Sequence, residues 1–179
     1  GQILRTAVAL SAFLNTPCRI TSIRHGRPKP GLRPQHLAGV QALAKLCRAE
    51  VQGLRLNSQE ITFRPGEIAG GEQHIATGTA GAVGLVLQSL MLPATRVPTP
   101  LRLTITGGTD VPWAPTVGYL IEVALPLLKK MDYRGELTVD KRGYFPRGGG
   151  EVRAEFKKAE LSPVDFTDQG DIVMIEGRS

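Results

Sequence analysis

The sequence has few of the features that mark disulfide-rich, metal-binding or membrane proteins. Its two cysteines, Cys18 and Cys47, form neither a Cys-x-x-Cys pair nor another spacing typical of metal ligands. We therefore expect free, buried thiols and a reducing compartment. No secretory signal is evident, so a cytoplasmic location is expected, or a nuclear one if the source is a eukaryote.

Long apolar runs are missing as well. The stretch from Gln73 to Thr95 carries no Asp, Glu, Lys or Arg, but its continuously apolar part of about 13 residues is too short to span a bilayer. Gly, Thr, Gln, Ser and Pro also interrupt it. Most of this stretch therefore predicts a buried helix, and no contact with a membrane is expected.

Acidic residues are outnumbered, 16 against 22 Lys and Arg, so the net charge is +6. A length of 179 residues with 41% hydrophobic content is enough for one sizeable domain or two small packed ones. The positive field attracts nucleic acid or nucleotides. A mildly basic protein without such a partner has the same composition, so charge alone leaves both interpretations open.

The first half of the chain predicts a series of helices and strands. A helix starts almost at residue 1, a strand follows at 19–24, and a loop rich in Pro, Gly and cations leads to a helix at about 34–47. Two further strands are predicted at 50–56 and 60–64. The apolar face of the first helix consists of Ile3, Ala7, Leu10 and Leu14.

The second half repeats this order. The segment LRLTITGG from residue 101 resembles RITSIRHG about 82 positions earlier. The predicted elements are a strand at 72–78, a helix at 82–92, a strand at 101–108, a helix at 113–131, and strands at 135–141 and 151–156.

This repetition predicts an α/β fold built from two βαβαββ modules of about 75 to 80 residues each. The first module, residues 1–68, lacks its opening strand; the second covers 69–158. Residues 159–179 are predicted to be a linker and a strand that lead toward a further part of the protein. A chance likeness between α/β patterns is the alternative, because the two halves share few identities.

The loop of the first module concentrates positive charge. Five basic side chains stand within ten residues, and three prolines restrict how far they can move apart. Like charges held together cost free energy unless an anion lies among them. Arg5 adds a cation to the first turn of a helix, where the macrodipole prefers an anion. These features predict a phosphate site, and a solvated basic loop is the alternative. The five residues are Arg24, His25, Arg27, Lys29 and Arg33.

The second module has different candidates. The sequence GGTD at 107–110 follows a predicted strand, and two glycines there let backbone amides approach a ligand. Gln88 occurs in a helix that is apolar on nearly all faces, so its amide is expected to need partners, either a neighbouring backbone or a nucleotide edge. Trp113, the only tryptophan, is expected in the core or at its rim rather than as a platform for a base.

The stretch RGYFPRGGGEV at 142–152 resembles the signature of the RNA 3'-terminal phosphate cyclases. Four other stretches resemble the family in the expected order: GQILR at the start, 23–37, 79–88 and GGTD. The signature positions that match are Arg142, Gly143, Pro146, Gly148, Gly149, Gly150 and Val152. We expect the three consecutive glycines to be structural, in a tight β-hairpin that passes close to a neighbouring element.

The resemblance implies an enzyme that uses ATP and a divalent cation, Mg or Mn, to convert an RNA 3'-phosphate into a 2',3'-cyclic phosphate through a histidine–AMP intermediate. By resemblance, Arg5, Arg24, Arg27 and Gln35 hold the RNA 3'-phosphate or the phosphates of ATP. Gln88 and Pro115 fall where the family contacts ATP. The resemblance also implies a fold like that of the C-terminal domain of translation initiation factor 3 and the enolpyruvate transferases, with a homodimer as one possible assembly.

Two departures from the family are expected to matter. The family's nucleophilic histidine follows a third module and is not His25, His36 or His74, so we expect this chain alone to be inactive. A Gly-rich stretch with a carboxylate, which precedes GQILR in the family, is also absent. His25 is expected near a ligand, whereas His36 and His74 are expected to be structural. The alternatives are a non-catalytic RNA-binding relative of ribosome assembly and an enolpyruvate transferase.

Overall fold

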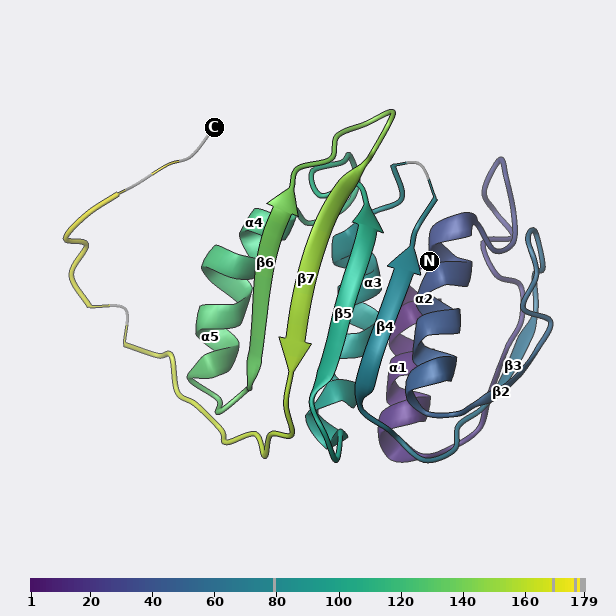
Figure 1. The fold of residues 1–179 in the computed structure, drawn as a ribbon, viewed down its shortest axis with the longest axis horizontal. Coiled ribbons are helices and arrows are strands. Elements are labelled where there is room, and N and C mark those ends of the chain that lie inside the picture. Colours follow the sequence, from purple (N-terminus) through teal and green to yellow (C-terminus); the bar gives the residue numbers. More distant parts are fainter. Residues whose placement is uncertain (79, 169, 176, 178–179) are drawn as a thin grey trace.

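The second half of the chain has the element order βαβαββ and forms one sheet. The computed structural model describes residues 1–78, 80–168, 170–175 and 177. The sheet has the order β4-β5-β7-β6, with β4 parallel to β5 and the other pairs antiparallel (Figure 1). The elements are β4 (Gly71–Ala76), α3 (Val83–Met91), η1 (Pro93–Arg96), β5 (Leu101–Gly107), α4 (Val117–Tyr119), the π-helical η2 (Leu120–Ala124), α5 (Leu125–Lys129), β6 (Gly135–Lys141) and β7 (Gly150–Phe156).

The first half repeats this arrangement without a counterpart of β4. Its three strands are antiparallel in the order β1-β3-β2, which is the order of their counterparts β5, β7 and β6. The predicted α/β class is therefore confirmed, whereas the predicted boundaries at residues 68 and 158 stay predictions. The elements are α1 (Gln2–Leu14), β1 (Cys18–Ile20), α2 (Pro34–Leu46), β2 (Glu50–Gln52) and β3 (Ile61–Arg64).

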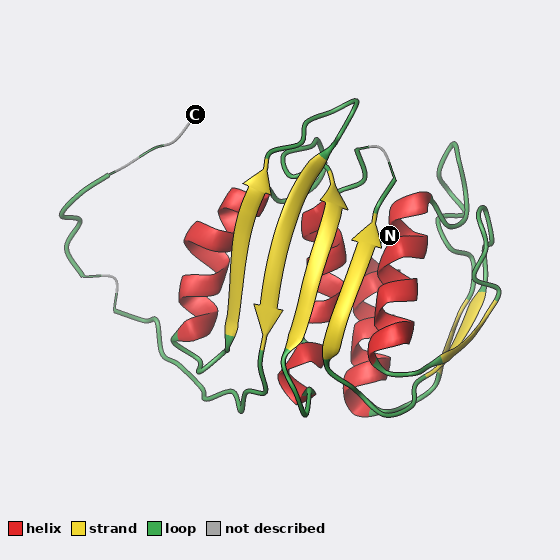
Figure 2. Ribbon diagram, viewed as in Figure 1, coloured by secondary structure: helices red, strands yellow, loops and turns green. Residues whose placement is uncertain are grey.

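The four-stranded sheet has one covered and one open face. In β5, Leu101, Leu103 and Ile105 are buried while the residues between them are more exposed, because successive side chains of a strand point to opposite faces. Helices cover the buried face and leave the other face open (Figure 2). Helices α1, α2 and α3 pack against one another, so the elements of both halves share one hydrophobic core.

The predicted apolar face of the first helix was wrong. Leu4, Val8 and Ala12, spaced one turn apart, are buried, whereas Ile3 is 80% exposed and Leu14 is 58% exposed. Leu10, from the predicted face, is also exposed. Apolar residues occupy more than one side of this helix, and its packing against α2 and α3 decides which side is buried.

Two predicted strands are shorter than expected because the backbone turns. The strand predicted at 19–24 ends at Ile20, since Ser22 and Arg24 have φ angles of 54° and 55°. The strand predicted at 50–56 ends at Gln52, before Gly53 with φ of 76°. Positive φ takes the chain out of the extended region that a ladder requires.

The helix predicted at 113–131 begins later, at Val117. Trp113 has φ of 66°, and the chain reaches a helical conformation only after Pro115. The side chain of Thr116 then accepts a hydrogen bond of 3.0 Å from the Tyr119 amide, which is an N-cap interaction. Pro126 cannot donate a hydrogen bond to the residue four positions earlier, and the widened π turn lies just before it.

The C-terminal segment extends away from the sheet (Figure 1). Its described residues from 157 onward form no helix and no strand. Residues 169, 176, 178 and 179 lie outside the described part, and the strand predicted within 159–179 stays a prediction. None of the helices in the described ranges is both long enough and apolar enough to span a bilayer.

Candidate functional site

Cationic groups from three elements converge near the start of α1. Arg5, Arg24 and Arg27 all lie close enough to the backbone nitrogen of Gly1 to act on it electrostatically. This coupling requires the three guanidinium groups to be close to the same point in space. The first 49 residues contain no Asp or Glu. We refer to Arg5, Arg24, Arg27 and Arg33 as the basic cluster.

The loop that carries Arg24 and Arg27 is anchored to the protein. The buried side chains of Ile23 and Leu32 hold its two ends, and their amides donate hydrogen bonds of 2.9 Å to the carbonyls of Gln59 and Ser58. Gly31, with φ of 77°, lies so close to the backbone of Asn57 that a Cβ there would clash. A loop fixed in this way cannot relieve repulsion between its charges by moving freely in solvent.

Two guanidinium groups of the basic cluster have a buried donor without a partner. The Nε atoms of Arg5 and Arg24 are inaccessible to solvent and make no hydrogen bond. One terminal nitrogen of each group is partnered: Nη2 of Arg5 donates to Gln2, and Nη2 of Arg24 donates to the Lys29 carbonyl. Burial also lowers the pKa of Arg5. Buried charged donors are normally satisfied, so these two Nε groups indicate a site for an anion.

His36 is buried beside these arginines. Its Nδ1 accepts a hydrogen bond of 3.0 Å from the Arg33 amide, and a Cβ placed on Gly1 would lie 3.0 Å from its Nε2. Burial is the largest cause that lowers the pKa of His36 to about 4, and the charges of Arg24, Arg5 and Arg33 act in the same direction. The ring is therefore neutral at pH 7, and with Nδ1 as acceptor its proton is on Nε2.

His36 thus has a structural role, as predicted, and also borders the basic cluster, which the sequence reasoning missed. The available signal was its spacing: it stands three residues after the N-cap of a helix that starts with Pro34. His25 lies on the loop of Arg24 and Arg27, so its expected position near a ligand stays a prediction. His25 is exposed and hydrogen-bonded to Gln59, and His74 is exposed on the open face of β4.

Gln35 connects the basic cluster to the second module. It is the residue before His36 in the first turn of α2, and its side-chain oxygen accepts a hydrogen bond of 3.3 Å from the amide of Ala82. Ala82 is the N-cap of α3. The structure therefore brings Arg5, Arg24 and Arg27 together, and it places Gln35 at the boundary between them and α3.

The two predicted ATP contacts share one side of α3. A Cβ on Gly84 would lie 2.8 Å from the carbonyl oxygen of Pro115, and Gln88 stands one helical turn after Gly84. The prediction that Gln88 needs partners inside an apolar helix was wrong, because Gln88 is exposed. Packing of α3 against its neighbours leaves this position open, so the amide is available to a ligand.

The glycines of the 142–152 hairpin are structural, as predicted. Gly148 and Gly149 have φ of 70° and 73°, a conformation that favours glycine. A Cβ on Gly143 would meet the Gly150 amide nitrogen at 2.3 Å and the Gly107 carbonyl oxygen at 2.4 Å. The hairpin therefore packs directly against the end of β5.

The GGTD loop is occupied with internal contacts. The carboxylate of Asp110 accepts hydrogen bonds from the Thr109 hydroxyl, at 2.6 Å, and from Arg142, at 3.1 Å. Trp113, which follows this loop, is wholly exposed, so the expectation that it lies in the core or at its rim was wrong. Across the described ranges, no three His, Cys, Asp or Glu side chains gather as a set that could hold a metal ion.

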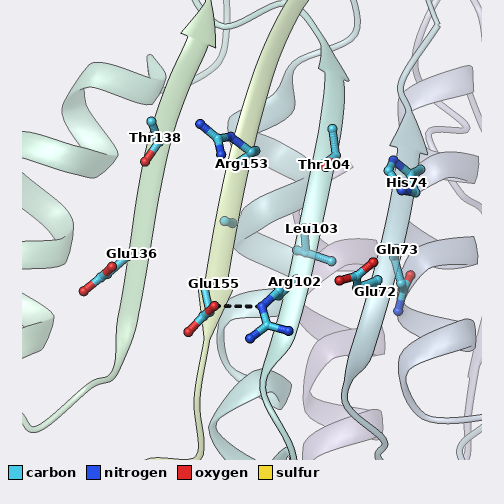
Figure 3. Close-up of a pocket in the computed structure, with 11 residues that line it drawn as sticks. Glu72, Gln73, His74, Arg102, Leu103, Thr104, Glu136, Thr138, Arg153 and Glu155 are labelled. Carbon is cyan, nitrogen blue, oxygen red and sulfur yellow. Dashed lines mark hydrogen bonds and ion pairs between the residues drawn. The ribbon is translucent and has the colours of Figure 1, made fainter.

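A shallow hollow on the open face of the four-stranded sheet has a different character (Figure 3). Its side chains alternate in charge, and Arg102 forms an ion pair of 3.0 Å with Glu155. Exposed pairs of this kind are typical of a solvated sheet face. None of the predicted site residues lines this hollow.

Comparison with known proteins gives a consistent result. The family model of the RNA 3'-terminal phosphate cyclase matches residues 1–173. The RNA 3'-terminal phosphate cyclase of Methanopyrus kandleri is 46% identical over 180 residues, which cover 100% of this chain and 51% of that protein. The protein of the same name from Archaeoglobus fulgidus is 49% identical over 173 residues, 97% of this chain and 53% of the relative. The chain thus spans about half the length of the curated relatives it matches.

Proposed function

Because this chain belongs to the RNA 3'-terminal phosphate cyclase family, we propose that it provides the phosphate-binding half of an enzyme that cyclises RNA 3'-ends. In this reaction an AMP group passes from ATP to a histidine, with release of pyrophosphate, and then to an oxygen of the RNA 3'-phosphate. The ribose 2'-hydroxyl attacks the activated phosphorus and expels AMP, leaving a 2',3'-cyclic phosphate. The histidine belongs to a part of the protein outside this chain.

The observation that carries the proposal is the pair of buried, unpartnered Nε groups of Arg5 and Arg24 within the basic cluster. A terminal phosphate monoester carries close to two negative charges and several acceptor oxygens. It would accept hydrogen bonds from the accessible nitrogens of these guanidinium groups and offset the mutual repulsion of the arginines. Fixed cations would also stabilise negative charge that moves between phosphate oxygens during transfer.

The ATP side of the reaction is assigned to the surface of α3. Gln88 would hydrogen-bond ATP through its exposed amide, and Pro115, held against Gly84, would form an apolar contact. Gln35 connects this surface with the basic cluster, because its side chain accepts a hydrogen bond from the amide of Ala82 at the start of α3. The two substrates would therefore meet around the start of α3.

A divalent cation is the remaining expected component. The described residues offer no group of acidic or histidine side chains that could hold it. We propose that phosphate oxygens of ATP provide its ligands, which is how Mg²⁺ is commonly bound at nucleotide sites. The role of the basic cluster does not depend on this ion.

The test compares RNAs that differ only at the 3'-end. We expect the chain to bind an RNA with a 3'-phosphate about tenfold or more tightly than the same RNA with a 3'-hydroxyl, because charge-assisted hydrogen bonds are lost. The Arg24→Ala/Arg27→Ala variant should abolish this difference. Equal affinity of the unmodified chain for both ends would refute the phosphate site.

A second measurement separates the enzyme from a non-catalytic relative. A protein that carries this chain together with the family's nucleophilic histidine should form the cyclic end with ATP, and the Arg24→Ala/Arg27→Ala variant should not. A non-catalytic RNA-binding protein would show no cyclisation to lose. An enolpyruvate transferase would instead bind phosphoenolpyruvate and transfer no label from ATP.

A further inference from the structure

Three large aromatic side chains are exposed on two neighbouring loops. Trp113 is 100% exposed, Phe145 is 69% exposed and Tyr144 is 59% exposed. Aromatic residues make up only 5% of the sequence, so this concentration differs from the isolated apolar residues found on any surface. We refer to Trp113, Tyr144 and Phe145 as the aromatic surface.

The two loops of the aromatic surface are joined by specific contacts. The Gly143 carbonyl accepts hydrogen bonds from the amides of Thr109 and Asp110, at 2.8 and 3.2 Å. Arg142 forms an ion pair with Asp110 at 3.1 Å, and Asp110 also pairs with Tyr144 in a β-bridge. These contacts hold the loop that carries Tyr144 and Phe145 against the loop that leads to Trp113.

The aromatic surface is linked to the basic cluster by backbone contacts. Gln35 of α2 binds the Ala82 amide, and Ala82 forms a parallel bridge with Gly108. Gly108 leads directly to Thr109 and Asp110, which hold the hairpin. The corresponding loops lie at the same end of the four-stranded sheet, the end near which the N-terminus lies (Figure 1). A chain molecule anchored at the basic cluster can therefore follow this edge.

Cations accompany the aromatic side chains. Lys141 and Arg147 of the same hairpin are exposed. Exposed aromatic faces next to cations are the combination that binds single-stranded nucleic acid, because bases stack on the rings and phosphates pair with the cations. The positive charges that flank the rings favour a polyanionic partner.

We propose that the aromatic surface binds the single-stranded RNA segment that precedes the two 3'-terminal nucleotides, by stacking its bases on Trp113, Tyr144 and Phe145. This inference rests on the proposed function, which places the terminal phosphate in the basic cluster. It adds a length requirement: the substrate needs an unpaired 3'-tail of several nucleotides, whereas the phosphate site alone needs one.

The experiment measures affinity as a function of RNA length. A dinucleotide and a hexanucleotide, both with a 3'-phosphate, are titrated into the chain, and fluorescence of Trp113, the only tryptophan, is recorded. We expect the hexanucleotide to bind more tightly, by about fivefold or more for each stacked base, and to quench Trp113. The Trp113→Ala and Tyr144→Ala/Phe145→Ala variants, measured by anisotropy of a labelled RNA, should lose this gain while binding the dinucleotide normally.

Phe166→Ala is the matched control, since Phe166 is a 53% exposed aromatic residue of the C-terminal segment; it should not change either affinity. Equal affinity of the unmodified chain for both lengths would overturn this inference while leaving the 3'-phosphate preference of the dinucleotide intact. A loss of ATP affinity in Trp113→Ala without a change in RNA affinity would also overturn it. So would a dimer of the unmodified chain that Trp113→Ala converts to a monomer, because the surface would then join two copies.

Discussion

The backbone amide of Arg33 donates a hydrogen bond of 3.0 Å to Nδ1 of His36, and this bond sets the tautomer of the buried, neutral ring. It caps the start of α2 and leaves the proton on Nε2, which lies near Gly1. Three arginines, Arg5, Arg24 and Arg33, act on the ring, and all three are cationic. One side chain therefore stabilises a helix and keeps an additional positive charge out of the basic cluster.

This arrangement predicts a pH dependence of stability. The pKa of His36 is about 4 in the folded chain against about 6.5 when unfolded, so the unfolded chain binds the proton first as the pH falls. The contribution of His36 to the free energy of unfolding should fall by an amount on the order of 3 kcal/mol between pH 6.5 and 4. Below pH 4 this contribution should stay constant.

Urea unfolding of His36→Asn checks this prediction, because asparagine keeps an acceptor for the Arg33 amide and cannot titrate. In this variant the free energy of unfolding should not show the decrease that His36 causes between pH 6.5 and 4. His74→Asn, at an exposed histidine, should retain it. An unchanged pH profile in His36→Asn would contradict the prediction.

Removing a partly buried cation should stabilise the chain when no anion is present. Arg5→Met keeps the length of the side chain and eliminates a buried Nε without a partner. We expect the free energy of unfolding to rise by about 1 kcal/mol in phosphate-free buffer. The increase in melting temperature that added phosphate gives the unmodified chain should be lost.

Thermal unfolding with and without phosphate measures both effects. Arg19→Met is the control, because Arg19 is exposed and paired with Glu60 at 2.7 Å; its response to phosphate should match that of the unmodified chain. If Arg5→Met lowered stability and kept the response to phosphate, Arg5 would not belong to an anion site.

The signature hairpin should not tolerate a methyl group at Gly143. A Cβ there would lie 2.3 Å from the Gly150 nitrogen and 2.4 Å from the Gly107 oxygen, which are both backbone atoms. We expect Gly143→Ala to lose on the order of 3 kcal/mol in the free energy of unfolding. Gly26→Ala, where nothing lies within 4 Å of the new atom, should be close to neutral. Similar denaturation midpoints for the two variants would rule out this packing.

Gln88 should matter for ATP and not for folding. Its side chain is exposed on α3, and alanine is a better helix former than glutamine, so Gln88→Ala should not reduce stability. We expect ATP affinity, measured by calorimetry, to fall about fivefold to tenfold as one hydrogen bond is lost. Gln41→Ala, at an exposed glutamine of α2, should leave it unchanged. A normal ATP affinity in Gln88→Ala would remove Gln88 from the site.

The repeated element order, the α/β class and the glycine hairpin could be predicted from the sequence. These features depend on local signals: alternation in β5, proline at the start of α2, and glycine where φ is positive at 148 and 149. The concentration of basic residues between Arg24 and Arg33 was also evident from the sequence. Each of these signals acts within a few residues, so no knowledge of distant contacts was needed.

The buried side of α1, the exposure of Gln88 and Trp113, and the position of His36 were decided by tertiary structure. Leu4 and Ile3 are both apolar, and only the packing of α1 against α2 and α3 determines that Leu4 is buried. The sequence by itself determined which residues are cationic and where the chain turns. Tertiary structure alone decided which cations meet and which donors lose contact with water, because burial and electrostatic coupling depend on distances between residues far apart in the chain.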